Sequence, residues 1–147
     1  MPASVRSQGC YRSGLITMIN RELYDAALRL IAESTKPGDA EDYEERAPYL
    51  LAVCVQEAAR IDRKMRKIRG LAEAIISSPV YLDLEEEFPL LQELAPAAIL
   101  YLGAMLILDA DETRSDVLYD RYCDTLLRME ESLPASLEAI ANQYGKW

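Results

Sequence analysis

The feature that most constrains this chain is the segment 95–108, which contains no charged residue. A helix that is apolar on all sides must be covered on all sides. As a helix the segment is roughly 21 Å long, whereas the hydrocarbon core of a bilayer is roughly 30 Å thick. We therefore predict a buried central helix over residues 88–108 and no membrane span. Pro96 requires either a kink in this helix or a later start.

Amphipathic patterns predict three further helices around the central one. They run from Asn20 to the turn at 36–39, from Asp39 to Gly70, and from Thr113 to about Ser132. Asn20 and Asp39 are expected to cap the first two helices, and Thr113 with Asp116 has the spacing of a capping box. The short turn before the last helix predicts that it packs antiparallel to the central helix.

The predicted fold class is all-α, a four-helix bundle-like domain over residues 18–133 with the apolar helix at its centre. The second helix has the clearest seam, with steps of four and three residues. The seam consists of Ala47, Leu51, Cys54, Ala58, Ile61, Met65 and Ile68. Residues 71–87 are predicted to be irregular, and residues 80–84 alternate weakly, as an extended segment does.

Both ends of the chain differ from the body. Residues 1–17 contain two Arg and no acid, which indicates either a disordered tail or a start codon assigned upstream of Met18. Residues 134–147 are a predicted tail that either folds back on the domain or docks on a partner. Tyr144 and Trp147 are its candidate contacts, because Tyr and Trp are favoured interface anchors.

The composition argues against an enzyme. The chain has a formal net charge of −9 and no His, so the usual general base and metal ligand are missing. Its three cysteines, Cys10, Cys54 and Cys123, match no metal-binding spacing. We expect Cys54 and Cys123 to be core residues on apolar helix faces, with a redox or nucleophilic thiol as the alternative. No cofactor is predicted.

A run of cations stands out within this acidic chain. Arg60, Arg63, Lys64 and Lys67 are the candidate partner-binding residues, and Arg66 and Arg69 lie in the same run. Such a run is compatible with a solvated face that complements the helix dipole, with a protein contact or with a nucleic-acid contact. No aromatic residue interleaves with the cations, which disfavours stacking on nucleic-acid bases.

A second charged cluster precedes the central helix. Its candidate partner-binding residues are Asp83, Glu85 and Glu86, followed by Glu87. Negative charge is favourable at this position simply because a helix begins nearby. A cation site is the alternative, although the aspartate and glycine pattern of a calcium loop is missing.

The hairpin over residues 89–112 and the following Leu118-Tyr119-Asp120-Arg121-Tyr122 resemble head–tail connector (adaptor or head-completion) proteins of long-tailed bacteriophages. In that family a helix rich in Ala and Leu ends in an acidic turn, and a helix with a Tyr-x-x-(Tyr/Phe) pattern packs back against it. The segment 42–47, which leads into an apolar helix, fits the same layout. The likeness covers roughly residues 19–133.

This resemblance implies a structural role in the virion neck, after assembly in the host bacterial cytoplasm. Such connectors form a ring below the portal protein, extend the DNA channel and receive the next neck or tail protein. The C-terminal segment often reaches the portal. The basic and acidic clusters are then candidates for the two halves of a head-to-tail subunit contact. The net negative charge would keep the channel from gripping DNA, because like charge repels the phosphates.

A small acidic helical regulator, such as an antitoxin or a DNA mimic, is the alternative function. A DNA mimic requires carboxylates spaced along one surface, whereas the acids of this sequence cluster at predicted helix starts.

Overall fold

The structure is a computed structural model that describes residues 17–134. The elements in order are α2 (Asn20–Leu30), the 3-10 turn η1 (Ala32–Ser34), α3 (Asp39–Arg69), the 3-10 turn η2 (Gln92–Leu94), α4 (Ala95–Leu106) and α5 (Glu112–Ser132). The described residues form no β-strand. The predicted all-α, bundle-like fold is therefore confirmed. The tail contacts Tyr144 and Trp147 lie outside the described residues.

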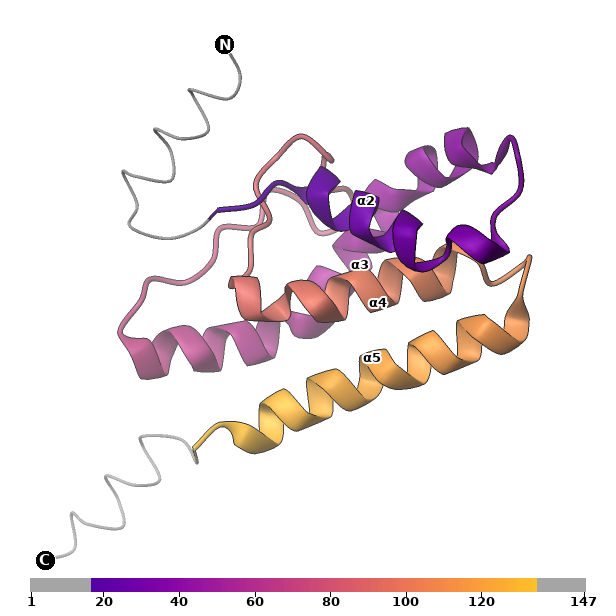
Figure 1. Ribbon diagram of the computed structural model, residues 1–147. Helices are drawn as coiled ribbons and strands as arrows, with labels where there is room; N and C mark the ends of the chain where they lie inside the picture. Colours follow the sequence, from indigo (N-terminus) through magenta and orange to yellow (C-terminus); the bar gives the residue numbers. More distant parts are fainter. Residues whose placement is uncertain (1–16, 135–147) are drawn as a thin grey trace, which may run out of the picture.

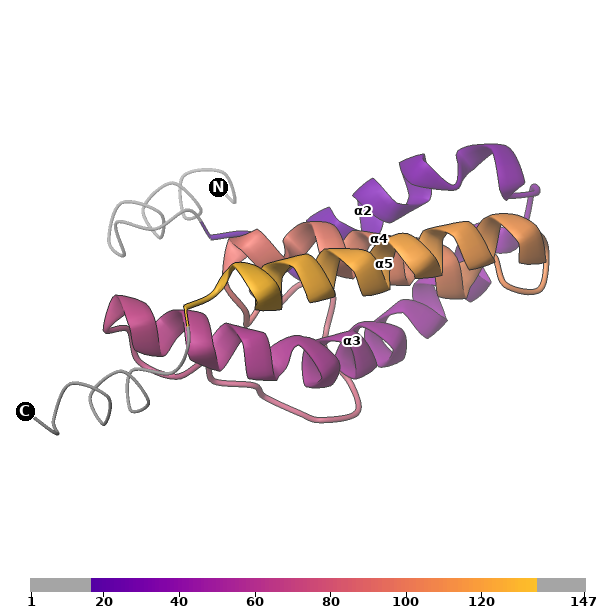
Figure 2. The same ribbon diagram turned by 90° about the horizontal axis from the view of Figure 1, so that it is seen from below.

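Helix α4 lies at the centre of the fold, in contact with α2, α3 and α5 (Figures 1 and 2). Helix α5 runs back along it in the opposite direction, as the short connection predicts. Ala97, Leu102 and Ala104 of α4 have no exposed surface. Gly103 permits a close approach, because a Cβ atom at this position would lie 3.2 Å from Cγ2 of Ile31.

The central helix is shorter at both ends than the predicted range 88–108, and of the two alternatives at Pro96 the later start is the one found. The helix begins at Ala95 and ends at Leu106, not over residues 88–108. Pro96 explains the late start: it lies in the first turn, where a helix needs no N–H from the residue. Residues 88–91 precede the helix in an irregular conformation, and Phe88, Leu90 and Leu91 are still buried.

Helix α3 carries the predicted apolar seam. Its members from Ala47 to Met65 are buried, and only Ile68 is exposed, at 40%. Gly70 ends the helix as predicted, with a left-handed φ of 70° that glycine adopts without strain. Pro48 lies inside the helix, and its carbonyl accepts the Leu82 N–H at 3.1 Å.

The predicted N-caps are wrong. Ile19 and Gly38 occupy the cap positions of α2 and α3. The Asn20 side chain instead donates from Nδ2 to the Asp83 carbonyl at 2.9 Å, and the Asp39 carboxylate accepts the Lys36 N–H at 2.7 Å. The cap of α5 is Asp111, whose carboxylate accepts the Arg114 N–H at 3.1 Å, and not Thr113. The side chains of Asn20 and Asp39 thus bond backbone groups outside their own helices.

Residues 70–91 wrap around the helices without forming a strand, including residues 80–84. Leu82 and Leu84 insert into the core. Near its end the segment pairs with the start of α2 through an isolated antiparallel bridge between Ile19 and Glu87. Asn20 N–H donates to the Glu86 carbonyl at 2.9 Å, and Phe88 N–H donates to the Met18 carbonyl at 2.7 Å. The irregular segment is thus fastened to α2.

Candidate functional site

The basic surface is defined here as Arg60, Arg63, Lys64 and Lys67, all exposed on α3. Helical spacing places them opposite Ala58, Ile61 and Met65, which face the core. These four cations, with Arg66, Leu71 and Glu73, line an open hollow of about 450 Å³. The α3 helix therefore presents positive charge to solvent next to a concave surface.

Two of these cations share one carboxylate. Arg60 lies 2.8 Å from one oxygen of Glu130 on α5, and Lys64 lies 3.2 Å from the other. Arg63 forms no ion pair with any residue in the range 17–134. Arg60, Arg63 and Lys64 have only the one carboxylate of Glu130 between them, so this part of the basic surface keeps an excess of positive charge in a chain whose net charge is −9.

The structure separates Arg66 and Arg69 from the basic surface. Arg66 forms an ion pair with Asp62 at 2.8 Å and donates to the carbonyls of Ala72 at 3.0 Å and Pro89 at 3.2 Å. Arg69 pairs with Glu93 at 2.6 Å. Arg66 holds the irregular segment against α3, and Arg69 holds the turn η2 that follows this segment.

Asp62 is a structural residue that the sequence analysis missed. It is 1% exposed, and besides its ion pair with Arg66 it accepts the Leu91 N–H at 2.8 Å. The sequence contained two signals for this role. An Asp and an Arg four residues apart meet on the same helix face, and Asp62 lies next to Ile61 of the apolar seam.

The acidic loop, defined as Asp83, Glu85 and Glu86, is exposed but has partners within the chain. Asp83 accepts the Glu85 N–H at 2.8 Å, and Glu86 accepts the Ser77 hydroxyl at 3.0 Å. Glu85 forms an ion pair with Arg21.

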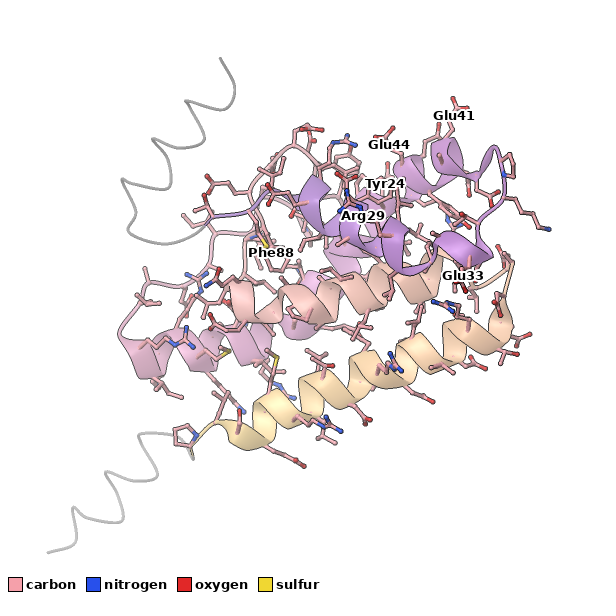
Figure 3. The ribbon with its side chains drawn as sticks, viewed as in Figure 1. Tyr24, Arg29, Glu33, Glu41, Glu44 and Phe88 are labelled. Atoms are coloured by element: carbon pink, nitrogen blue, oxygen red, sulfur yellow. The ribbon has the colours of Figure 1, made fainter. Side chains whose placement is uncertain are left out.

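Arg21 bridges the acidic loop to α3, because it also lies 2.7 Å from Glu44. Figure 3 shows Glu44 beside Tyr24, where α2 meets the first turns of α3. Burial, followed by the Glu44 charge, raises the pKa of Tyr24 above its usual range. The acidic loop is therefore joined to α2 and the start of α3, whereas the basic surface is joined to the end of α5. The structure does not bring the two predicted clusters together within one chain.

A third charged feature was missed by the sequence analysis. Asp116, Asp120 and Asp124 lie four residues apart on α5, and all three are exposed. The spacing places them on one face of the helix, opposite the buried Leu118 and Tyr122. The regular spacing of four was visible in the sequence.

The two described cysteines differ in environment. Cys54 is buried at 2% exposure, as predicted, and burial raises the pKa of its thiol to about 12. The thiol is therefore protonated at neutral pH and is not a nucleophile. The prediction that Cys123 is a core residue is wrong, because its position on α5 turns it to solvent.

A polar and aromatic cluster surrounds Cys54. The Tyr122 hydroxyl donates to Glu57 at 2.9 Å, and the Tyr122 and Tyr101 rings lie 5.0 Å apart. Burial raises the pKa of Tyr101 to about 12 and that of Tyr122 further. This cluster stabilises the contact of α3, α4 and α5.

Residues 17–134 contain neither a metal-binding cluster nor a membrane-spanning helix. No group of three or more His, Cys, Asp or Glu side chains in this range is arranged to hold a metal ion. No helix in this range is long and apolar enough to cross a membrane.

Comparison of the chain with protein-family models, with characterised proteins and with solved structures finds no match. Functional inference therefore depends on the surfaces described above.

Proposed function

We propose that this chain is a structural connector protein of a tailed-bacteriophage neck. In this proposal it assembles as a ring below the portal protein, extends the DNA channel and receives a downstream neck or tail protein. It acts by assembly, without a cofactor and without catalysis. Its place is the virion neck, after a period in the host cytoplasm.

The observation that carries the proposal is the basic surface on α3. Arg60 and Lys64 already share Glu130, and Arg63 has no ion pair in the described range. Excess positive charge beside a hollow of about 450 Å³, on a chain of net charge −9, supports a contact with an acidic protein surface. The order of the helices also supports the proposal, since α4 and α5 form the hairpin that resembles the connector family.

The test is negative-stain microscopy of the full chain, alone and mixed with the portal protein of its own genome. We expect a ring or a second tier of density below the portal. Arg63→Glu, Lys64→Glu and Lys67→Glu together are expected to remove that density. The control reverses the exposed acids Asp25, Glu33 and Glu45 to Lys, which changes three surface charges elsewhere, in the opposite direction, and leaves the basic surface unchanged. A monomer that never binds the portal would contradict the proposal.

The second candidate function is the acidic regulator of the DNA-mimic type. It is favoured by the three aspartates of α5, whose spacing is regular along one surface, as a mimic of phosphates requires. The microscopy separates the two functions, because a regulator would ignore the portal.

A further inference from the structure

The aspartates of α5 carry repeated negative charge that no residue in the described part of the chain neutralises. The carboxylates of Asp116, Asp120 and Asp124 form no ion pair or hydrogen bond with any described residue. Like charges four residues apart destabilise a helix by about 0.2–0.5 kcal/mol per pair. A pattern that costs stability locally is expected where a surface has a function.

The basic surface of α3 carries the opposite pattern. Arg60 and Lys64, and likewise Arg63 and Lys67, are like charges four residues apart. Arg60 and Lys64 share the single carboxylate of Glu130, and Arg63 forms no ion pair with a described residue. Along the helix axis the basic surface spans roughly 10 Å, and the three aspartates span roughly 12 Å. The two surfaces therefore match in length and are opposite in charge.

The acidic loop is less suited to this role. Glu85 is bound by Arg21, and Glu86 accepts a hydrogen bond from Ser77. The carboxylates of the α5 aspartates have no such partner within residues 17–134, so they gain more from an external cation. Leu127, which follows them on the same helix, is 54% exposed, and Val53, which precedes the basic surface, is 47% exposed. In an antiparallel arrangement of the two helices these apolar side chains would lie at the same end.

We propose that Asp116, Asp120 and Asp124 of one copy bind the basic surface of α3 in a second copy. The contact joins two different surfaces, so it is head-to-tail and propagates to a ring or a filament. This inference rests on the ring in the proposed function and deepens it by naming both halves of the contact.

The test uses two charge-reversed forms of the full chain. The first carries Asp116→Lys, Asp120→Lys and Asp124→Lys. The second carries Arg63→Glu, Lys64→Glu and Lys67→Glu. Sedimentation velocity is measured for each alone and for their equimolar mixture, at about 50 mM and about 500 mM salt, because salt screens such contacts. Asp25→Lys, Glu33→Lys and Glu45→Lys together form the control, with the same change in net charge as the first variant.

We expect the wild-type chain and the control to self-associate at low salt. Each reversed variant alone is expected to associate at least about tenfold more weakly. Their mixture is expected to regain association, because the lysines of the first variant then meet the glutamates of the second. A misfolded variant would not be rescued in this way.

Three results would overturn the inference. They are a wild-type chain that stays monomeric at low salt, a mixture that regains no association, and binding of the basic surface to duplex DNA in place of a second copy. The portal experiment separates this inference from the proposed function. A failed rescue with intact portal binding would refute only the proposed contact between copies. A successful rescue without portal binding would refute only the proposed role in the neck.

Discussion

The backbone N–H of Leu91 donates a 2.8 Å hydrogen bond to the buried carboxylate of Asp62. The second oxygen of this carboxylate holds Arg66, which in turn binds the carbonyls of Ala72 and Pro89. One ion pair inside α3 thus fixes both ends of the irregular segment. The position of the irregular segment therefore depends on Asp62 and Arg66.

Replacing Asp62 is therefore expected to destabilise the fold strongly. Asp62→Ala should lower the free energy of unfolding by about 3–5 kcal/mol, because Arg66 loses its charge partner in a largely buried site. Asp62→Asn keeps an acceptor for Leu91 and should cost about 1–3 kcal/mol. Urea unfolding followed by circular dichroism measures both. Asp25→Ala, at an exposed aspartate of α2, is the control, and equal losses for Asp62→Ala and this control would refute the assignment.

The central position of α4 leads to a second prediction. Leu102→Ala should lower the free energy of unfolding by about 2–5 kcal/mol, because this side chain has no exposed surface and its removal leaves a cavity. Leu127→Ala, at a residue that is 54% exposed, should change it by less than about 0.5 kcal/mol. Thermal and urea unfolding of the two variants should rank them in this order. A small loss at Leu102 would mean that α4 is not the centre of the core.

The thiols of Cys54 and Cys123 should differ in reactivity. In a Cys10→Ser background, Cys123 is expected to be alkylated quickly by iodoacetamide at pH 8. Cys54 should react roughly a thousandfold more slowly, since its pKa of about 12 leaves little thiolate. Peptide mass spectrometry over time assigns each modification. Equal rates in the folded chain, with both thiols reactive in urea, would contradict the burial of Cys54.

The stability of the fold should fall at alkaline pH. Burial raises the pKa of Cys54 from 9.0, and that of Tyr101 from 10.0, to about 12 in the folded chain. Above pH 9 the unfolded chain releases these protons first, so the stability present below pH 9 is lost as pH rises towards 12. Cys54 alone should account for about 2 kcal/mol between pH 9 and 11. Cys54→Ala should show a smaller fall over this range, and an unchanged fall would assign the effect to other groups.

Periodicity predicted much of the fold because it reports how side chains pack. The seam on α3, the stop at Gly70, the antiparallel pair of α4 and α5 and the all-α class are all found in the structure. Helix ends were harder to predict. The Asn20 side chain bonds the Asp83 carbonyl, a partner that only the tertiary structure supplies, and the Asp39 side chain bonds the Lys36 N–H in the preceding turn.

The candidate site was predictable in part. The basic surface follows from local helix spacing, and its residues do lie together. The division of the six cations into a solvent-facing group and a group that binds other segments does not follow from helix spacing. The bonds of Arg66 to the Ala72 and Pro89 carbonyls and the pair of Arg69 with Glu93 form only through packing. The α5 aspartates are harder to find in the sequence, because acids spaced four residues apart stand out less than a run of adjacent acids such as residues 85–87.

The pairing of residues 18–21 with residues 84–88 has a consequence for folding kinetics. Helices α4 and α5 are neighbours in sequence and can dock through a short connection. The contact between Asn20 and Asp83, in contrast, joins positions 63 residues apart. Contacts of high sequence separation slow folding, because a long loop must close before they form. We expect refolding to be slower than for an up-and-down bundle of this size. The start of α2 should form its native contacts last during refolding, and its amide hydrogens should exchange first in the folded chain.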